Sequence, residues 1–175
     1  MTVEFVEFPK MARLSREIIV TEKLDGTNAA VQVVPLAEAP GGADWTGEGF
    51  AVFAQSRTRF ITPEDDNFGF ARWVQEHAAE LAAGLGVGVH FGEWWGQGIQ
   101  RNYGMTTKRF SLFNVSRWAD PDKRPSCCDV VPELYRGDFT TAAVSAAIES
   151  LRVGGSVAAP GFMKPEGVVV FHTAG

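Results

Sequence analysis

The sequence predicts an α+β fold in which antiparallel sheets are flanked by helices. Two observations favour this class: strand-like segments rich in β-branched and aromatic residues outnumber the two segments with helical periodicity, and no internal repeat is present. In addition, Asp25-Gly26 separates two strand-like segments, and D-G is a common hairpin turn. With 175 residues, of which 45% are hydrophobic, the chain is expected to form a single domain over residues 1–175.

Strands are predicted where β-branched and apolar residues are bounded by turn residues. In chain order, they cover residues 16–22, 29–34, 50–56, 87–94, 109–118 and 167–172. The segment 35–49, rich in Ala, Pro and Gly, is expected to be an irregular loop. Within 109–118, Phe110 and Phe113 have opposite parity. We therefore expect Phe110 in the core and Phe113 on the other face of the strand.

Two helices are predicted. The first is capped by Asp66 or Asn67 and runs to about residue 83, with an apolar stripe typical of core packing. The second covers about 141–152, capped by Thr140 and ended by Gly154-Gly155. The glycine-rich run at 84–88 precedes a strand and lacks the third glycine of a dinucleotide-binding loop. It is therefore interpreted as a helix-to-strand turn.

Charge and composition exclude several classes of function. The net charge of −5 and the pI of 5.2 argue against a protein that coats nucleic acid by charge alone, although a local basic groove is compatible with them. No apolar run approaches the roughly 20 residues of a membrane-spanning helix, and no signal peptide is evident. The adjacent Cys127 and Cys128 indicate neither a disulfide framework nor a zinc site. A cytoplasmic protein without membrane association is expected.

Lys23 lies in the segment E-K-L-D-G-T-N, residues 22–28. A primary amine beside a carboxylate and a glycine turn suits a covalent nucleophile, provided that the amine loses its proton and its target is held in line. Asp25 either takes part in this chemistry or only shapes the turn. The motif is short enough to occur by chance, so the interpretation depends on what accompanies it.

Four further segments supply groups that attack on a nucleotide phosphate requires. S-R-T-R at 56–59 carries Arg57, suited to phosphate. F-G-E-W at 91–94 carries Glu93, suited to a ribose hydroxyl, and F-S-L-F-N at 110–114 carries Phe113, suited to stacking on a purine. P-E-G-V-V-V at 165–170 carries Glu166, suited to a hard divalent cation.

This ordered set of motifs resembles the covalent nucleotidyltransferases, which are unrelated to the ATP-grasp ligases. Within that group, E-K-L-D-G-T-N most resembles the adenylyltransferase domain of ATP-dependent RNA ligases of the second phage type, and the match spans residues 22–171. The resemblance implies that Lys23 attacks the α-phosphate of ATP, releasing pyrophosphate and leaving a lysyl-AMP. The AMP then moves to a 5′-phosphate end, and a 3′-hydroxyl displaces it to seal the strand.

The resemblance also implies roles for individual residues and ligands. It places Asn28 and Arg57 at the nucleic-acid end and Glu166 at Mg²⁺, with Mn²⁺ as an alternative. The nucleotide site would comprise Glu22, Lys23, Arg57, Glu93, Phe113 and Glu166. The implied partners are ATP and RNA ends, with DNA as an alternative and no obligate protein partner. Arg101, in a glycine-rich loop at 96–107, is a candidate to reach substrate.

One departure from the family pattern leaves alternatives open. The family has a lysine pair, K-x-K, after E-G-V-V, whereas this chain ends at Gly175 and Lys164 precedes Glu166. Either the chain is a truncated piece of a longer ligase, or the metal and Arg57 carry more of the phosphate charge. A DNA ligase, a GTP-using capping enzyme and a non-catalytic module that binds nucleotide or RNA ends are the competing hypotheses.

Overall fold

The computed structural model describes residues 16–39, 41–43 and 45–173; the remaining positions of the predicted domain 1–175 lie outside this part. Its elements are β1 (Glu17–Lys23), β2 (Thr27–Pro35), the 3-10 turn η1 (Leu36–Glu38), β3 (Trp45–Gly47), β4 (Phe50–Ser56), β5 (Phe60–Ile61), α1 (Phe70–Leu85), β6 (Gly88–Gly96), β7 (Lys108–Leu112), α2 (Val115–Trp118), β8 (Cys128–Val130), β9 (Glu133–Asp138), α3 (Thr141–Gly154) and β10 (Gly167–His172).

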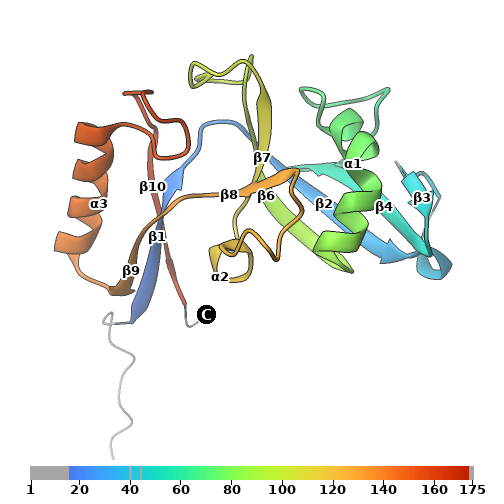
Figure 1. Cartoon of the computed structure of the whole chain (residues 1–175), viewed down its shortest axis with the longest axis horizontal. Helices are drawn as coiled ribbons and strands as arrows, with labels where there is room; N and C mark the ends of the chain where they lie inside the picture. Colours follow the sequence, from blue (N-terminus) through green and yellow to red (C-terminus); the bar gives the residue numbers. More distant parts are fainter. Residues whose placement is uncertain (1–15, 40, 44, 174–175) are drawn as a thin grey trace, which may run out of the picture.

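The strands form two sheets, which confirms the predicted α+β class. The smaller has the order β10-β1-β9, and the larger has the order β3-β4-β2-β6-β7-β8, with β5 added beside β4. All strand pairs are antiparallel except β7 with β8. Figure 1 shows the smaller sheet with α3 at one end of the molecule and the larger sheet with α1 at the other.

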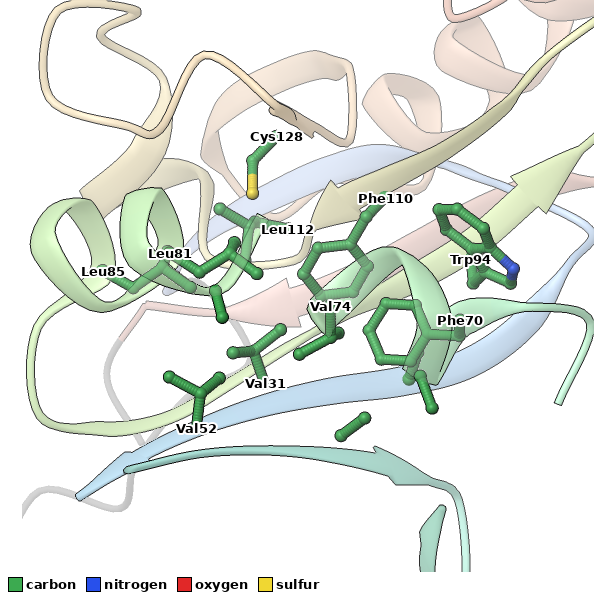
Figure 2. Packing of buried hydrophobic residues seen from close by; sticks show 14 of the residues in the cluster. Val31, Val52, Phe70, Val74, Leu81, Leu85, Trp94, Phe110, Leu112 and Cys128 are labelled. Carbon is green, nitrogen blue, oxygen red and sulfur yellow. The ribbon is translucent and has the colours of Figure 1, made fainter. Parts of the chain in front are cut away.

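The main core lies between α1 and one face of the larger sheet. Alternate residues of β2, such as Val31 and Val33, point to α1 because successive side chains of a strand face opposite sides. The aromatic ring of Phe70 lies 5.4 Å from that of Trp94 and 5.1 Å from that of Phe110, measured between centroids (Figure 2). The predicted apolar stripe of the first helix therefore packs in the core, as expected from its helical spacing.

A second buried cluster joins the two sheets. Ile19 and Leu24, from β1 and the segment after it, pack with Trp95 of β6 and with Tyr103. On the opposite face of β1, Ile18 and other apolar residues pack against α3. β1 is thus covered on both faces, which fixes its end at Lys23 relative to the larger sheet.

The predicted hairpin at Asp25-Gly26 is wrong. β1 pairs with β10 and β9, whereas β2 pairs with β4 and β6, so the chain passes from one sheet to the other between them. Glycine is required at position 26 by close packing: a Cβ there would meet the carbonyl of Trp94 and would lie 2.7 Å from Cβ of Trp95. The D-G pair marks a crossing between sheets.

The predicted strand at 109–118 is too long. It ends at Leu112 as β7, and residues 115–118 form the short helix α2. Asn114 caps this helix, because its side-chain oxygen accepts from the backbone N–H of Arg117 at 3.1 Å. The expected difference in burial is confirmed, because Phe110 is fully buried and Phe113 is 39% exposed, but Phe113 lies just beyond the end of β7 and not on its other face.

Other boundaries differ by a few residues. α1 begins at Phe70, later than predicted, although the carboxylate of Asp66 accepts from the N–H groups of Ala71 and Arg72 at 2.8 and 3.1 Å and so satisfies the first turn. The segment expected to be an irregular loop contains η1 and β3. Thr140 caps α3 as predicted, accepting from the N–H of Ala143 at 3.0 Å.

We expect Phe110→Ala to lower the free energy of unfolding by about 3–5 kcal/mol, because the truncation leaves a cavity among fully buried aromatic rings. Phe113→Ala, which removes the same atoms from a partly exposed side chain, should lower it by about 1 kcal/mol or less. Urea denaturation of both variants measures the difference. Equal losses would contradict the assignment of Phe110 to the core and of Phe113 to the cleft surface.

Candidate active site

The two sheets border a cleft of about 980 Å³. It is lined by the end of β1 and the start of β2, by β6, by the segment after β7 and by β10. All the residues that the sequence analysis assigned to nucleotide, metal or nucleic-acid ends lie along it: Glu22, Lys23, Asn28, Arg57, Glu93, Phe113 and Glu166. Motifs up to 143 residues apart in sequence are therefore brought to one site.

Lys23 and Glu166 form an ion pair across the end of the smaller sheet. The register of β1 and β10 sets Lys23 opposite Gly167, which brings the neighbouring Glu166 within reach. The amine donates to Oε1 of Glu166, and the lysine side chain remains 48% exposed. The other oxygen, Oε2 of Glu166, is buried and has no hydrogen-bond partner among the described residues. This leaves a free acceptor beside the amine.

Glu93 connects the larger sheet to the turn that follows Lys23. It lies opposite Asn28 in the β2–β6 register. Its Oε1 accepts from the N–H of Gly26 at 3.1 Å, and its Oε2 accepts from Nδ2 of Asn28 at 3.2 Å. Burial raises the pKa of Glu93 to about 7; the Gly26 N–H and the positive charge of Lys23 oppose this shift, and nearby negative charges reinforce it.

Glu22 is almost fully buried, and sequence patterns gave no indication of its partners. Its Oε2 accepts from the backbone N–H groups of Val157 and Ala158, at 2.9 and 3.0 Å. Its Oε1 is buried without a partner in the part of the chain that the structure describes. The loop after α3 thus orients a carboxylate that retains one unused acceptor.

Exposed apolar side chains line part of the cleft. Phe113 extends from the end of β7, and its N–H donates to the carbonyl of Phe91 at 3.0 Å. Phe91, Val169 and Phe171 are each at least 40% exposed and also line the cleft. A planar apolar ligand would find contact area here.

The two arginines of the S-R-T-R segment differ in their surroundings. Arg57 lines the cleft just beyond β4 and has no ion-pair partner within the described residues. Arg59 forms a bidentate pair with Asp65, at 2.6 and 3.0 Å. Of these two arginines, only Arg57 offers its charge to a ligand in the cleft.

Asp25 is hydrogen-bonded to the glycine-rich loop at 96–107, which carries Arg101, the residue considered as a candidate to reach substrate. Its Oδ2 accepts from Nε of Arg101 at 2.7 Å, and its N–H donates to the hydroxyl of Tyr103 at 2.8 Å. Asp25 lines the cleft, whereas Arg101 is not among the lining residues. These contacts shape the turn between Lys23 and Gly26.

The described residues, those of the cleft included, contain no group of three or more His, Cys, Asp or Glu side chains placed to hold an ion. Cys127 and Cys128 are free thiols, with 4.0 Å between their sulfur atoms. Over the same residues, no helix has the length and apolar character to cross a membrane.

Comparison with known proteins indicates one family. A model of the RNA ligase family matches residues 16–174 of this chain. Among solved structures, a mutant of the Naegleria gruberi RNA ligase R4a in its apo form is similar, with a TM-score of 0.54 and 20% sequence identity. The similarity covers 90% of this chain and 47% of that chain, so this chain spans about half the length of that ligase. No curated protein matches the chain.

The raised pKa of Glu93 makes stability depend on pH. The folded protein holds the Glu93 proton up to about pH 7, whereas the unfolded chain releases it near the ordinary value of 4.5. The free energy of unfolding of the wild type should therefore fall relative to that of Glu93→Gln as the pH rises from about 5 to 8. Urea denaturation of both proteins at several pH values measures this difference, and a constant difference would rule out the shift.

Proposed function

Because the chain belongs to the RNA ligase family, we propose that the cleft is the nucleotide site of an ATP-dependent RNA ligase that acts through a lysyl-AMP intermediate. One observation carries the proposal. Two buried side-chain oxygens lack a hydrogen-bond partner in the described part of the chain, Oε1 of Glu22 and Oε2 of Glu166, and both belong to residues of the Lys23 cleft. Buried acceptors in folded proteins nearly always have a partner, which is a protein group, an ordered water, an ion or a ligand, so each of these two oxygens offers a position that a bound ligand or ion can fill.

In the first step, the neutral amine of Lys23 forms a bond to the α-phosphorus of ATP. The bond from that phosphorus to the bridging oxygen breaks, pyrophosphate leaves, and the proton lost from the amine passes to solvent. In the second step, an oxygen of the RNA 5′-phosphate bonds to the α-phosphorus, the N–P bond breaks, and the amine regains a proton. In the third, a 3′-hydroxyl attacks the 5′-phosphate, loses its proton, and displaces AMP.

The residues present fit a divalent cation. Mg²⁺ is commonly bound in proteins by one or two carboxylates together with substrate phosphates, and Oε2 of Glu166 is a buried oxygen available for that purpose. Glu166 would hold Mg²⁺ or Mn²⁺. A bound cation would reduce the negative charge that repels an electron-rich nucleophile from the α-phosphate. Arg57 would contribute a second positive charge toward phosphate.

Base selection would come from Phe113 and Glu22. Phe113 provides an exposed aromatic face for stacking. An ionised carboxylate accepts hydrogen bonds and cannot donate them. Oε1 of an ionised Glu22 therefore suits the exocyclic amine of adenine, which donates, and disfavours the carbonyl that guanine presents at the same position. Glu93 would accept from a ribose hydroxyl. These roles favour ATP over GTP.

Recognition of the nucleic-acid end would involve Asn28 and Arg57 at the cleft. Asn28 is oriented by its bond to Glu93, and Arg57 has no ion-pair partner within the described residues. An amide and a guanidinium together suit a terminal hydroxyl and a phosphate. Because the matching family is that of the RNA ligases, RNA ends are favoured over DNA ends as the substrate.

Incubation with α-labelled ATP and the divalent cation should label the protein on Lys23, and α-labelled GTP should give little label. Lys23→Ala should abolish labelling, whereas Lys164→Ala, a nearby lysine on the segment before β10, should retain it. Denaturing electrophoresis followed by peptide mass spectrometry locates the adduct. AMP found on Lys108 or Lys164 would refute the assignment.

In the Lys23→Ala background, where no transfer takes place, Phe113→Ala should weaken ATP binding by about 1–3 kcal/mol, because one stacking contact with the base is lost. Phe60→Ala, which truncates another exposed phenylalanine outside the cleft, serves as the matched control and should leave binding unchanged. Isothermal titration calorimetry measures both. Normal affinity in the Phe113 variant would remove the stacking role.

A further inference from the structure

The loop between β6 and β7, residues 97–107, is built around Arg101. Two buried side chains hold it in place: Ile99 enters the core of the larger sheet, and Tyr103 packs between Trp95 and Phe162, with ring centroids 4.9 and 4.7 Å away. Asn102 supports it internally, because its side-chain oxygen accepts from the N–H of Gly98 at 2.7 Å. Arg101 therefore projects from between two fixed points.

The backbone on both sides of Arg101 is in an uncommon conformation. Gln100, Asn102 and Tyr103 have φ angles of 44°, 62° and 51°, in the left-handed region that residues other than glycine seldom adopt. Such conformations persist only where surrounding contacts impose them, and they cluster at functional sites. The strain and the buried anchors together indicate a loop held for the position of its side chains.

The guanidinium of Arg101 joins the two chain segments that carry the ion pair of the cleft. Its Nε donates to Oδ2 of Asp25 at 2.7 Å, two residues after Lys23. Its Nη1 donates to the carbonyls of Lys164 and Pro165 at 2.9 and 3.3 Å, directly before Glu166. The guanidinium of Arg101 thus connects the segment just after Lys23 with the segment just before Glu166.

We propose that Arg101 is a positioning residue that aligns Lys23 and Glu166 for attack on the α-phosphate. The inference rests on the proposed function. Arg101 does not line the cleft, so it acts through Asp25 and the 164–165 backbone and does not contact the nucleotide. Its charge also offsets that of Asp25, which otherwise faces the site of a triphosphate. A lysine could not replace it, because one ammonium cannot span a carboxylate and two carbonyls in the fixed planar geometry of a guanidinium.

Single-turnover labelling of Lys23 from α-labelled ATP tests the proposal. Arg101→Ala should lower the maximal labelling rate about 10- to 100-fold, the scale of losing alignment at a reacting centre, with less than about a 3-fold change in the ATP concentration giving half-maximal rate. Arg101→Lys should remain slow, and guanidinium ion at tens of millimolar should restore part of the rate of Arg101→Ala. The double variant with Asp25→Asn should be no slower than Arg101→Ala, because the two residues act as a unit.

Arg152→Ala is the matched control, since it breaks an exposed arginine–carboxylate pair on α3, and its rate should equal that of the wild type. Thermal melting of each variant separates loss of alignment from loss of fold. A rate for Arg101→Ala within 2-fold of the wild type would overturn the proposal. The proposal would also be overturned if the labelling rate of Arg101→Ala fell in proportion to its melting temperature and guanidinium ion did not restore it.

A second measurement does not depend on ATP. Reductive methylation with formaldehyde, quantified by mass spectrometry, reports the reactivity of Lys23 relative to the exposed Lys123. Arg101→Ala should raise this ratio several-fold, toward that of Glu166→Gln, because the ion pair is no longer held. If the wild type forms no lysyl-AMP, the proposed function fails, and the methylation ratio alone decides the positioning role; an unchanged ratio overturns it.

Discussion

The close packing of Gly26 against β6 sets how closely the two sheets of the molecule approach each other. The chain leaves the smaller sheet at Lys23 and enters the larger sheet at Thr27, and a side chain at position 26 would collide with Trp94 and Trp95. The same glycine donates its N–H to Glu93. Because the two sheets approach each other through this backbone, a larger residue would separate them and would displace Lys23 from the groups on the opposite wall of the cleft.

Around this crossing, each carboxylate of the site has a different set of partners. Glu166 pairs with Lys23, Asp25 pairs with Arg101, and Glu93 and Glu22 accept from N–H donors. Charge in a partly buried site is costly unless it is paired or hydrogen-bonded. These contacts therefore offset the electrostatic repulsion among the acidic side chains of the site. They also leave two buried acceptors unused within the described residues, one on Glu22 and one on Glu166. The proposed nucleotide and cation would complete those positions.

Sequence patterns predicted which residues gather at the cleft better than they predicted the path of the chain. Residues such as Lys23, Glu93 and Glu166 belong to short motifs whose chemistry is local. The different burial of Phe110 and Phe113 was also expected, although Phe113 lies beyond the end of β7. The crossing at Gly26 could not be predicted, because the need for glycine comes from packing against a strand almost 70 residues later. Arg101 was considered only as a candidate to reach substrate, since its partners lie 76 and 63 residues away along the chain and follow no periodic pattern.

If the proposal holds, the cleft between the two sheets is one nucleotide site, and a bound nucleotide contacts both sheets. Hydrogen–deuterium exchange with and without a non-hydrolysable ATP analogue, in the presence of Mg²⁺, measures those contacts. We expect the nucleotide to slow exchange together in three segments: residues 21–28 of the crossing, 89–93 of β6, and 166–171 at β10. Protection confined to one sheet, or found only on a surface away from the cleft, would refute a single nucleotide site between the sheets.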